Sequence, residues 1–545
     1  MHLSFEIYLS FRETLFSSLS SSEKLAYLKD TLVYPKNYLY TTVSYLQSGI
    51  TETKREEITK EAFTHWINFK GAIGADENLY HILEANTKDE DTKDKLSHLR
   101  SLRKRYAALM MGNEVKQKEK EHLEKEIASI EKYLSKKITL FKESQQLSQL
   151  SINDLSEVMP EDSLYLDYAD TDAGIFLFSF GKSDRPYLHH ISQKNSKRIK
   201  ELLPKWIEIS EKFLMIWGRV DENDNDKRRE VLEKHGKLSE IKEILSEIYE
   251  LLIKEPLGEL LDEHDKLIIS TDGILNRLGF EMLYDKESKS YLVESKEISY
   301  TPSVKELVRS YKFGKQDKDG IAIFADPDFD ATDIPSVDFQ IESSKNKMRD
   351  SSLEKFTPLS FSKEEADNIK DLYTSTSDFL KKEANTKNLF SKESNKKILH
   401  LSTHGFFIED ATEPNDMLKS GIALSGANHP EKKGVCTALD IMALDLGGTK
   451  LVTLSACQTA LGKDISGEGV LGLSRAFHFA GAHHLLMTLW SVFDYETKEF
   501  MTKFYQYLKS GKPYSQALRQ TKIDFIHSSH SSHPYLWGAF VMSGV

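Results

Sequence analysis

The sequence has only two cysteines, Cys436 and Cys457, among its 545 residues. Two cysteines cannot build the dense disulfide framework of small secreted domains, so the composition predicts a reducing compartment such as the cytoplasm. No apolar run reaches the ~18 residues that a membrane-spanning helix needs, and the N-terminus lacks the basic start of a signal peptide. We therefore expect a cytoplasmic protein with no membrane partner.

Proline and glycine are scarce in residues 1–150, where Pro35 is the single proline and only four glycines occur. A region so poor in helix breakers and so rich in Lys, Glu and Leu is predicted to be all-helical. An apolar residue recurs there every three or four positions, giving a stripe of Leu123, Ile127, Ile130, Leu134, Ile138 and Phe141. The stripe predicts one buried face of a long helix. That face could pack within the chain, in degenerate tetratricopeptide-like helical repeats, or form a coiled coil with a second chain.

Positive charge is in deficit, because 73 Lys and Arg face 85 Asp and Glu, a formal net charge of −12. An acidic chain is a poor general binder of nucleic acid, so we expect no direct nucleic-acid partner. The 39% hydrophobic and 29% charged residues are typical of a soluble globular protein, and the length suggests two to four domains.

After residue 150 the sequence alternates between short apolar runs and amphipathic stretches. We expect residues 151–312 to form one α/β unit and residues 318–545 a second, separated by the charged, glycine-containing stretch 313–320. Near-continuous apolar strands separated by helices predict a mainly parallel sheet with helices on both faces. A Ser-x-x-Glu capping box from Ser362 to Glu365 predicts the start of one of these helices.

Two residues with catalytic chemistry fall at predicted carboxyl ends of strands, where sites form in parallel sheets. His404 ends the run KKILHLSTH, and Cys457 ends the run LVTLSAC 53 residues later. A nearby imidazole is the usual means of converting a thiol into a nucleophilic thiolate. Gly405 allows close backbone approach, so its N–H and that of Cys457 are candidate donors to an oxyanion. The spacing alone leaves a structural role for both side chains open.

His400 is the nearest competitor for the role of general base. It lies four residues before His404, inside the expected strand and, by alternation, on the same face. We expect it to be a packed core residue.

Several motifs, in order along the chain, resemble the CHAT family of caspase-like cysteine peptidases, which is related to separase. They are KLIISTDGILNRLGFEMLY, HLSTHG, LVTLSACQTALG and GVLGLSRAFHFAGA, and the resemblance spans about residues 150–545. It implies a caspase-like α/β fold and peptide-bond hydrolysis by a Cys–His dyad without metal or cofactor. It assigns the general base to His404, the nucleophile to Cys457 and the oxyanion hole to the backbone of Gly405 and Cys457. It also implies a non-catalytic, pseudo-caspase-like unit before the active one, a role that residues 151–312 fit.

The same resemblance points to Asp494, which ends the run TLWSVFD, as a residue of the S1 substrate pocket. Its position is similar to that of the separase acid that pairs with an arginine preceding the cleaved bond. A desolvated carboxylate selects Arg or Lys by charge-assisted hydrogen bonds. Asp494 also fits the N-cap of the helix that follows, and the two roles are compatible.

Two weaker patterns predict no bound group. The stretch 462–469, GKDISGEG, lacks the ending of a phosphate-binding loop, and we expect a loop beside the nucleophile. His527, His530 and His533 are spaced three apart, but no Cys or clustered carboxylate joins them. We therefore expect no metal site.

The resemblance leads us to expect a regulated cysteine endopeptidase whose helical N-terminal region docks an activating protein. Prokaryotic CHAT peptidases serve in antiviral defence and programmed cell death, which would make the substrate a gasdermin-like or CRISPR-associated protein. The alternative is a catalytically silent scaffold on the same fold. A nucleotide hydrolase is disfavoured, because phosphate-binding and metal-binding motifs are lacking.

Overall fold

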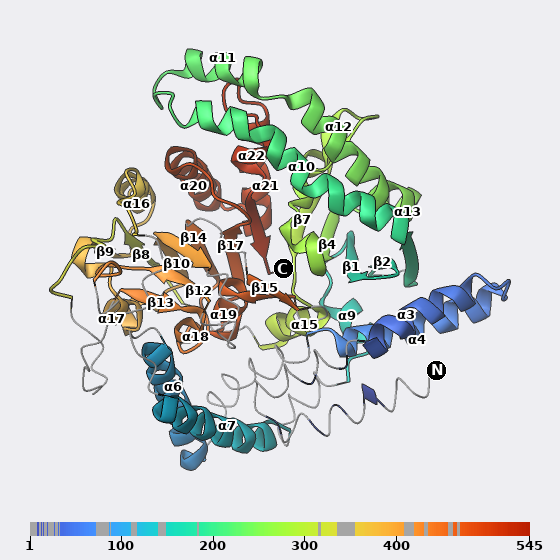
Figure 1. Ribbon diagram of the computed structural model, residues 1–545, viewed down its shortest axis with the longest axis horizontal. Helices are drawn as coiled ribbons and strands as arrows, with labels where there is room; N and C mark the ends of the chain where they lie inside the picture. The colour runs from blue at the N-terminus through green and yellow to red at the C-terminus, as the bar shows by residue number, and fades with distance from the viewer. Residues whose placement is uncertain are drawn as a thin grey trace.

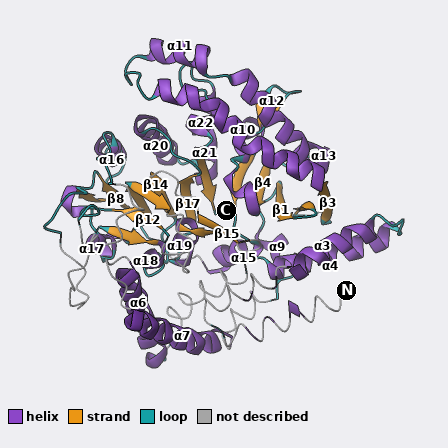
Figure 2. Ribbon diagram, viewed as in Figure 1, coloured by secondary structure: helices purple, strands orange, loops and turns teal. Residues whose placement is uncertain are grey.

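Helices lie on both sides of a central sheet in the computed structural model of the protein (Figures 1 and 2). The structure describes residues 33–71, 89–110, 117–139, 149–182, 185–313, 318–334, 355–407, 419–429, 434–455, 462–465 and 469–544, together with single positions before residue 90. In the view of Figure 1, α10 (Gln193–Trp217) and α20 (Asp494–Lys509) lie above the sheet, whereas α15 (Val304–Phe313) and α19 (Leu473–Phe479) lie below it.

The described part of the N-terminal region is helical, as predicted. Its long helices are α3 (Val33–Leu46), α4 (Glu52–Phe69), α6 (Glu90–Met110) and α7 (Gln117–Thr139). The side chains of Leu123 and Leu134, in the predicted stripe of α7, are almost fully buried. Helix α7 packs on α6, and Arg103 of α6 forms a 2.8 Å ion pair with Glu131 of α7. The described part of the stripe thus has an intramolecular partner, while the side chain of Ile138 and all of Phe141 lie outside the described residues.

One mixed sheet of eleven strands passes through both predicted α/β units, in the order β3-β2-β1-β4-β7-β18-β17-β14-β10-β8-β9. Its strands are β1 (Ser163–Thr171), β2 (Gly174–Gly181), β3 (Tyr187–Ser192), β4 (Lys266–Ser270), β7 (Glu297–Tyr300), β8 (Ile321–Ala325), β9 (Thr376–Leu380), β10 (Ile398–Ser402), β14 (Leu451–Ser455), β17 (His484–Thr488) and β18 (Phe540–Ser543). Pairs β1–β2, β2–β3 and β17–β18 are antiparallel, and the remaining neighbours are parallel. This confirms the predicted mainly parallel α/β architecture.

The two predicted units meet inside this sheet. β7 is the last strand of residues 151–312 and β18 the last strand of residues 318–545, and the two pair in parallel with Tyr300 opposite Ser543. The two units are therefore joined within the sheet through the last strand of each, and not through the stretch 313–320 that connects them in sequence.

Further helices cover the sheet and smaller sheets flank it. The other α-helices are α9 (Ile152–Val158), α11 (Asn225–His235), α12 (Leu238–Tyr249), α13 (Glu255–Leu257), α14 (Leu292–Ser295), α16 (Ser362–Lys370), α17 (Thr386–Leu389), α18 (Ala438–Ile441), α21 (Tyr514–Ile526) and α22 (Pro534–Trp537). The short π- and 3-10 helices are η1 (Glu250–Lys254), η2 (Gly258–Leu261), η3 (Gly273–Arg277), η4 (Phe280–Met282), η5 (Lys381–Glu383) and η6 (Lys392–Ser394). The small sheets pair β11 (His404–Phe407) with β12 (Ser420–Ala423) and β12 with β13 (Val435–Thr437), β15 (Gly462–Ile465) with β16 (Gly469–Gly472), and β5 (Tyr284–Asp285) with β6 (Ser290–Tyr291).

Helix α16 begins at Ser362, as predicted, but two local details differ from the prediction. Phe361, not Ser362, is the N-cap of α16, and it makes no side-chain cap hydrogen bond. The Ser362 hydroxyl instead donates to the Ser402 carbonyl of β10 at 3.1 Å. This side chain therefore attaches α16 to the sheet and does not cap the helix. The stretch 462–469 was expected to be a loop, but its described residues contribute β15 and the start of β16, an antiparallel hairpin.

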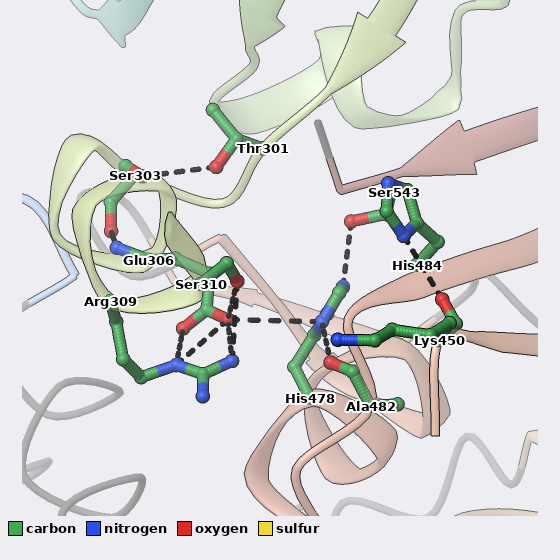
Figure 3. A network of polar contacts seen from close by, with 10 residues as sticks. All are labelled: Thr301, Ser303, Glu306, Arg309, Ser310, Lys450, His478, Ala482, His484 and Ser543. Atoms are coloured by element: carbon green, nitrogen blue, oxygen red, sulfur yellow. Dashed lines mark hydrogen bonds and ion pairs between the residues drawn. The ribbon is translucent and has the colours of Figure 1, made fainter. Parts of the chain in front are cut away.

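A buried polar network joins the two predicted units below the sheet (Figure 3). On α15, the Nε of Arg309 donates to both carboxylate oxygens of Glu306 at 3.1 Å. His478 of α19 lies next to this pair, with its Nδ1 bound to the Ala482 carbonyl at 3.2 Å and its Nε2 bound to the Ser543 hydroxyl at 2.8 Å. Burial lowers the pKa of His478, against the opposing effect of Glu306, so the imidazole is held neutral. Helix α19 is thereby fixed to β18 and to the neighbourhood of α15.

Candidate active site

Strands β10 and β14, which precede His404 and Cys457, are neighbours in the sheet, as the predicted site requires. β10 and β14 run in parallel, Ser402 pairs with Ser455, and the Thr403 amide donates to the Ser455 carbonyl at 3.2 Å. His404 and Cys457 each come two residues after this last pair. Cys457 lies outside the described residues, so its placement beside His404 stays a prediction based on the strand register.

His404 does not continue β10, as the sequence had suggested. The strand ends at Ser402, and His404 begins β11, which pairs with β12 in the small three-stranded sheet. The hydroxyl of Thr403 donates to the Ala423 carbonyl and fixes the bend between the two strands. The bend places His404 at the rim of the main sheet, partly exposed, instead of within it.

A backbone carbonyl orients the His404 imidazole. Its Nε2 lies 2.7 Å from the carbonyl oxygen of Thr357. A carbonyl can only accept, so Nε2 carries a proton, and in the neutral form of the imidazole Nδ1 is the nitrogen with the lone pair. The rings of Phe329 and Phe356 flank the imidazole at centroid distances of 5.3 and 5.7 Å. An imidazole held in one tautomer with one basic nitrogen has the form that a general base requires.

Gly405 lies next to His404 in β11, opposite Ile422 of β12. This position at the rim is compatible with an N–H that reaches a substrate carbonyl. Its assignment to an oxyanion hole together with the Cys457 amide stays a prediction.

Asp494 lies within electrostatic reach of His404, and it is not the N-cap of α20. The helix begins at Asp494 itself, and Phe493 is its N-cap. The Asp494 carboxylate accepts a hydrogen bond from the Phe361 amide at 2.8 Å, at the start of α16. Burial raises the pKa of Asp494, while the Phe361 amide and the neighbouring His404 oppose the shift. Asp494 and His404 thus bind the same segment of chain, through Phe361 and Thr357, and the S1 role of Asp494 stays a prediction.

His400 is fully buried, and each of its ring nitrogens lies close to a polar side chain. Nε2 lies 2.8 Å from a carboxylate oxygen of Glu365 in α16, and Nδ1 lies 3.1 Å from the Tyr505 hydroxyl in α20. That hydroxyl donates onward to the Thr453 side chain of β14 at 2.9 Å. These contacts connect β10 and β14 to the covering helices α16 and α20. The expectation that His400 is a core residue is therefore met, and it is no candidate base.

Four residues of the site were missed from the sequence: Phe329, Phe356 and Thr357, which contact His404, and Asn428, whose side chain binds the Phe356 backbone. Thr357 acts through its backbone carbonyl, which every residue carries, so its identity gives no signal. The only local sequence signal is Pro358, since a residue before proline is biased toward an extended conformation. Asn428 follows β12 in a turn, where asparagine is common for local reasons.

Among the described residues, no group of three or more His, Cys, Asp and Glu side chains is arranged to hold a metal ion. His533, from the triple-histidine stretch, is instead used in the core. Its Nε2 donates to the Gly236 carbonyl at 3.0 Å and its Nδ1 accepts from the Tyr535 amide at 3.2 Å. Within the residues that the structure describes, no helix combines the length and the hydropathy that crossing a bilayer requires.

Residues 242–545 match the family model of the CHAT domain. The chain belongs to the CHAT domain family. This confirms the resemblance seen in the motifs around His404 and Cys457. The matched residues begin within helix α12 and run to the end of the chain, so they contain both β10 and β14.

Curated relatives of this CHAT protein are much longer than the chain. Human Tetratricopeptide repeat protein 28 is 33% identical over 141 residues, which are 26% of this chain and 6% of that protein. Its mouse counterpart is 36% identical over 115 residues, which are 21% of this chain and 5% of that protein. The match therefore covers a small fraction of either relative.

Solved structures similar to this CHAT protein include the Saccharomyces cerevisiae separase–securin complex, with a TM-score of 0.45, 12% identity, and coverage of 75% of this chain and 32% of that chain. A second structure of that complex has a TM-score of 0.43 at 12% identity and covers 90% and 37%. The Arg-specific cysteine proteinase gingipain R has a TM-score of 0.31 at 9% identity and covers 56% and 66%.

Proposed function

We propose that the chain is a regulated cysteine endopeptidase in which Cys457 is the nucleophile and His404 the general base. The observation that carries the proposal is the fixed tautomer of His404, whose Nε2–H is bound to the Thr357 carbonyl. The buried His400, by contrast, has partners on both nitrogens, as expected of a structural histidine. Membership of the CHAT domain family and the register of β10 and β14 support the pairing with Cys457.

The proposed reaction is acyl transfer followed by hydrolysis. Nδ1 of His404 accepts the proton of the Cys457 thiol, and the thiolate attacks the carbonyl carbon of the scissile peptide bond. Negative charge develops on the carbonyl oxygen, which the amides of Gly405 and Cys457 stabilise. His404 then protonates the leaving amine as the C–N bond breaks, leaving a thioester on Cys457. Water, deprotonated by His404, hydrolyses the thioester and restores the thiol.

Asp494 is proposed to select a basic residue before the cleaved bond. The carboxylate is partly buried and within electrostatic reach of His404, and a partly buried carboxylate discriminates strongly in favour of a cation. Its hydrogen bond from the Phe361 amide leaves further lone pairs for a guanidinium or ammonium group.

The N-terminal helices are proposed to dock an activating protein. Support comes from the helical character of the described residues in this region and from relatives named for tetratricopeptide repeats. We place the peptidase in the cytoplasm, in prokaryotic defence or cell-death signalling, with a gasdermin-like or CRISPR-associated protein as substrate. This part of the proposal rests on the family resemblance.

The proposal is tested by digesting a proteome-derived peptide library with the wild-type chain and three variants. We expect wild type and Cys436→Ala to cleave the same peptides, Cys457→Ala to cleave none, and His404→Ala to be slower by about 1,000-fold or more. Cys436 is a suitable control because it is buried in β13. A wild-type chain that cleaves no peptide and whose Cys457 reacts with iodoacetamide no faster than Cys436 would indicate the silent scaffold instead.

A further inference from the structure

The segment from Lys355 to Phe361 crosses the candidate site and is held there through its backbone. In its middle, the Thr357 carbonyl accepts from His404. At its end, the Phe361 amide donates to the Asp494 carboxylate at 2.8 Å. At its start, the backbone of Phe356 is bound by the side chain of Asn428.

Asn428 binds both polar groups of the Phe356 backbone. Its Oδ1 accepts from the Phe356 amide at 2.9 Å, and its Nδ2 donates to the Phe356 carbonyl at 2.8 Å. A carboxamide that engages an N–H and a C=O of one residue fixes the position and orientation of that residue. Nδ2 also lies 3.2 Å from a carboxylate oxygen of Asp330.

The turn that carries Asn428 is itself anchored, so the side chain starts from a defined position. The Asn428 amide donates to the Phe329 carbonyl at 2.9 Å, and the Gly426 amide donates to the Asp328 carbonyl at 2.9 Å. Gly426 has a φ of +82°, and a Cβ there would lie 3.0 Å from a side-chain carbon of Ile334. The positive φ and the close approach to Ile334 therefore favour glycine at this position of the turn.

Phe356, the residue that Asn428 fixes, is related to the predicted base His404 in two ways. Its ring packs on the imidazole of His404, and its carbonyl carbon begins the peptide unit that leads to Thr357. The next residue, Pro358, restricts the backbone on the other side of the Thr357 carbonyl. A shift of Phe356 would consequently move both the aromatic contact and the carbonyl that sets the tautomer of His404.

We propose that Asn428 is a positioning residue, which holds the Thr357 carbonyl in place for His404. The expected effect of Asn428 on catalysis rests on the proposed function, whereas its effect on the tautomer of His404 does not depend on peptidase activity. Geometry at a catalytic base is demanding, and a displacement of about 1 Å can lower a rate by about 100-fold. Asn428 touches the orienting segment and not the reacting atoms, so its loss should act on kcat rather than on substrate binding.

The test compares Asn428→Ala with Asn388→Ala in the full-length chain. Asn388 is a matched control, because its Nδ2 donates to the carbonyl and the carboxylate of Glu383, each at 2.8 Å, away from this segment. We expect Asn428→Ala to lower kcat about 10- to 100-fold with KM within twofold, and Asn388→Ala to leave both within twofold. Equal behaviour of the two variants, or a raised KM with unchanged kcat for Asn428→Ala, would overturn the proposal. If Asn428→Ala fails to fold, Asn428→Asp is measured instead, since it keeps the acceptor for the Phe356 amide but loses the donor to its carbonyl.

A second readout separates this proposal from the peptidase proposal. In ¹⁵N-histidine-labelled chain, the imidazole signals of His404 are assigned by their absence in His404→Ala. We expect wild type and Asn388→Ala to show the tautomer protonated at Nε2, and Asn428→Ala to show exchange between tautomers. This result in a chain without peptidase activity would support the role of Asn428 and refute the peptidase proposal. An unchanged His404 spectrum in Asn428→Ala would refute the role of Asn428 whether or not the chain cleaves peptides.

Discussion

Replacement of Lys70 by Met should lower the free energy of unfolding by about 3–5 kcal/mol, the usual cost of removing one partner of a buried ion pair. Lys70 directly follows α4 and reaches the central sheet, where its Nζ lies 2.7 Å from a carboxylate oxygen of Asp167 in β1. Each side chain is 1% exposed. Nζ also donates to the carbonyls of Tyr168 and Ser270, at 3.1 and 3.4 Å.

The magnitude follows from what remains around Asp167 in the variant. Its described contacts would be the indole N–H of Trp66 at 3.0 Å and the hydroxyl of Tyr165 at 2.5 Å. Two neutral donors offset only part of the cost of a buried carboxylate, so the loss should far exceed that of a surface pair. A matched control is Lys60→Met on the same helix, where the 2.9 Å pair with Glu56 is exposed and should contribute little to stability.

The assay is urea unfolding followed by the fluorescence of the five tryptophans, one of which, Trp66, donates to Asp167. The double variant Lys70→Met/Asp167→Asn should be more stable than Lys70→Met alone, since it removes the uncompensated charge. The reasoning is refuted if Lys70→Met costs no more than Lys60→Met. It is also refuted if the two changes at positions 70 and 167 simply add.

Two further predictions concern pH and specificity. Burial lowers the pKa of His533 to about 3, whereas an unfolded histidine titrates near pH 6.5, so the unfolded chain binds more protons and acid destabilises the fold. The free energy of unfolding should therefore fall by about 2 kcal/mol between pH 7 and pH 5 through His533. In the folded chain, a proton on Nδ1 would break the hydrogen bond from the Tyr535 amide. His533→Gln should show a correspondingly shallower loss in urea unfolding, and identical slopes would contradict this account. Asp494→Ala should lower kcat/KM for peptides with Arg before the cleaved bond by about 10- to 100-fold in library profiling, and strong cleavage after Leu that is the same in both proteins would argue against an S1 role.

Many of the strands and helices after residue 150 could be predicted, because a local sequence pattern marks each of them. β8, β10 and β14 are short apolar runs bounded by polar residues, and α20 ends before Gly511, whose φ is +91°. The predicted neighbours β10 and β14 are adjacent in the sheet. Parallel strands joined by a crossover are commonly neighbours, so the relation of their ends was predictable as well.

The remaining features depend on contacts between distant segments, which leave no periodic signal. Pairing of β7 with β18 joins residues more than 200 positions apart, and nothing in either strand specifies its partner. Ser362 and Glu365 have the spacing of a capping box, but each side chain contacts a residue of β10 instead of the backbone of its own helix. The carbonyl of Thr357 carries no side-chain signature at all.

The same distinction applies to the charged residues of the core. Lys70 and Asp167 look like ordinary surface residues in the sequence, since charged residues are rarely buried unless paired. Their burial is a property of how α4 meets β1, 97 positions later in the chain. Only the three-dimensional arrangement shows that the N-terminal helices are attached to the sheet by a buried charge pair.

The pairing of Cys457 with His404 is tested most directly by the rates at which the two cysteines react with iodoacetamide. Cys436 is 1% exposed and serves as an internal reference in the same sample. We predict that Cys457 is alkylated at least about 10-fold faster than Cys436, and that His404→Ala removes most of this advantage, because the thiolate is the reactive species. Equal slow rates at both cysteines in the wild-type chain, or a fast Cys457 that is unaffected by His404→Ala, would contradict the account.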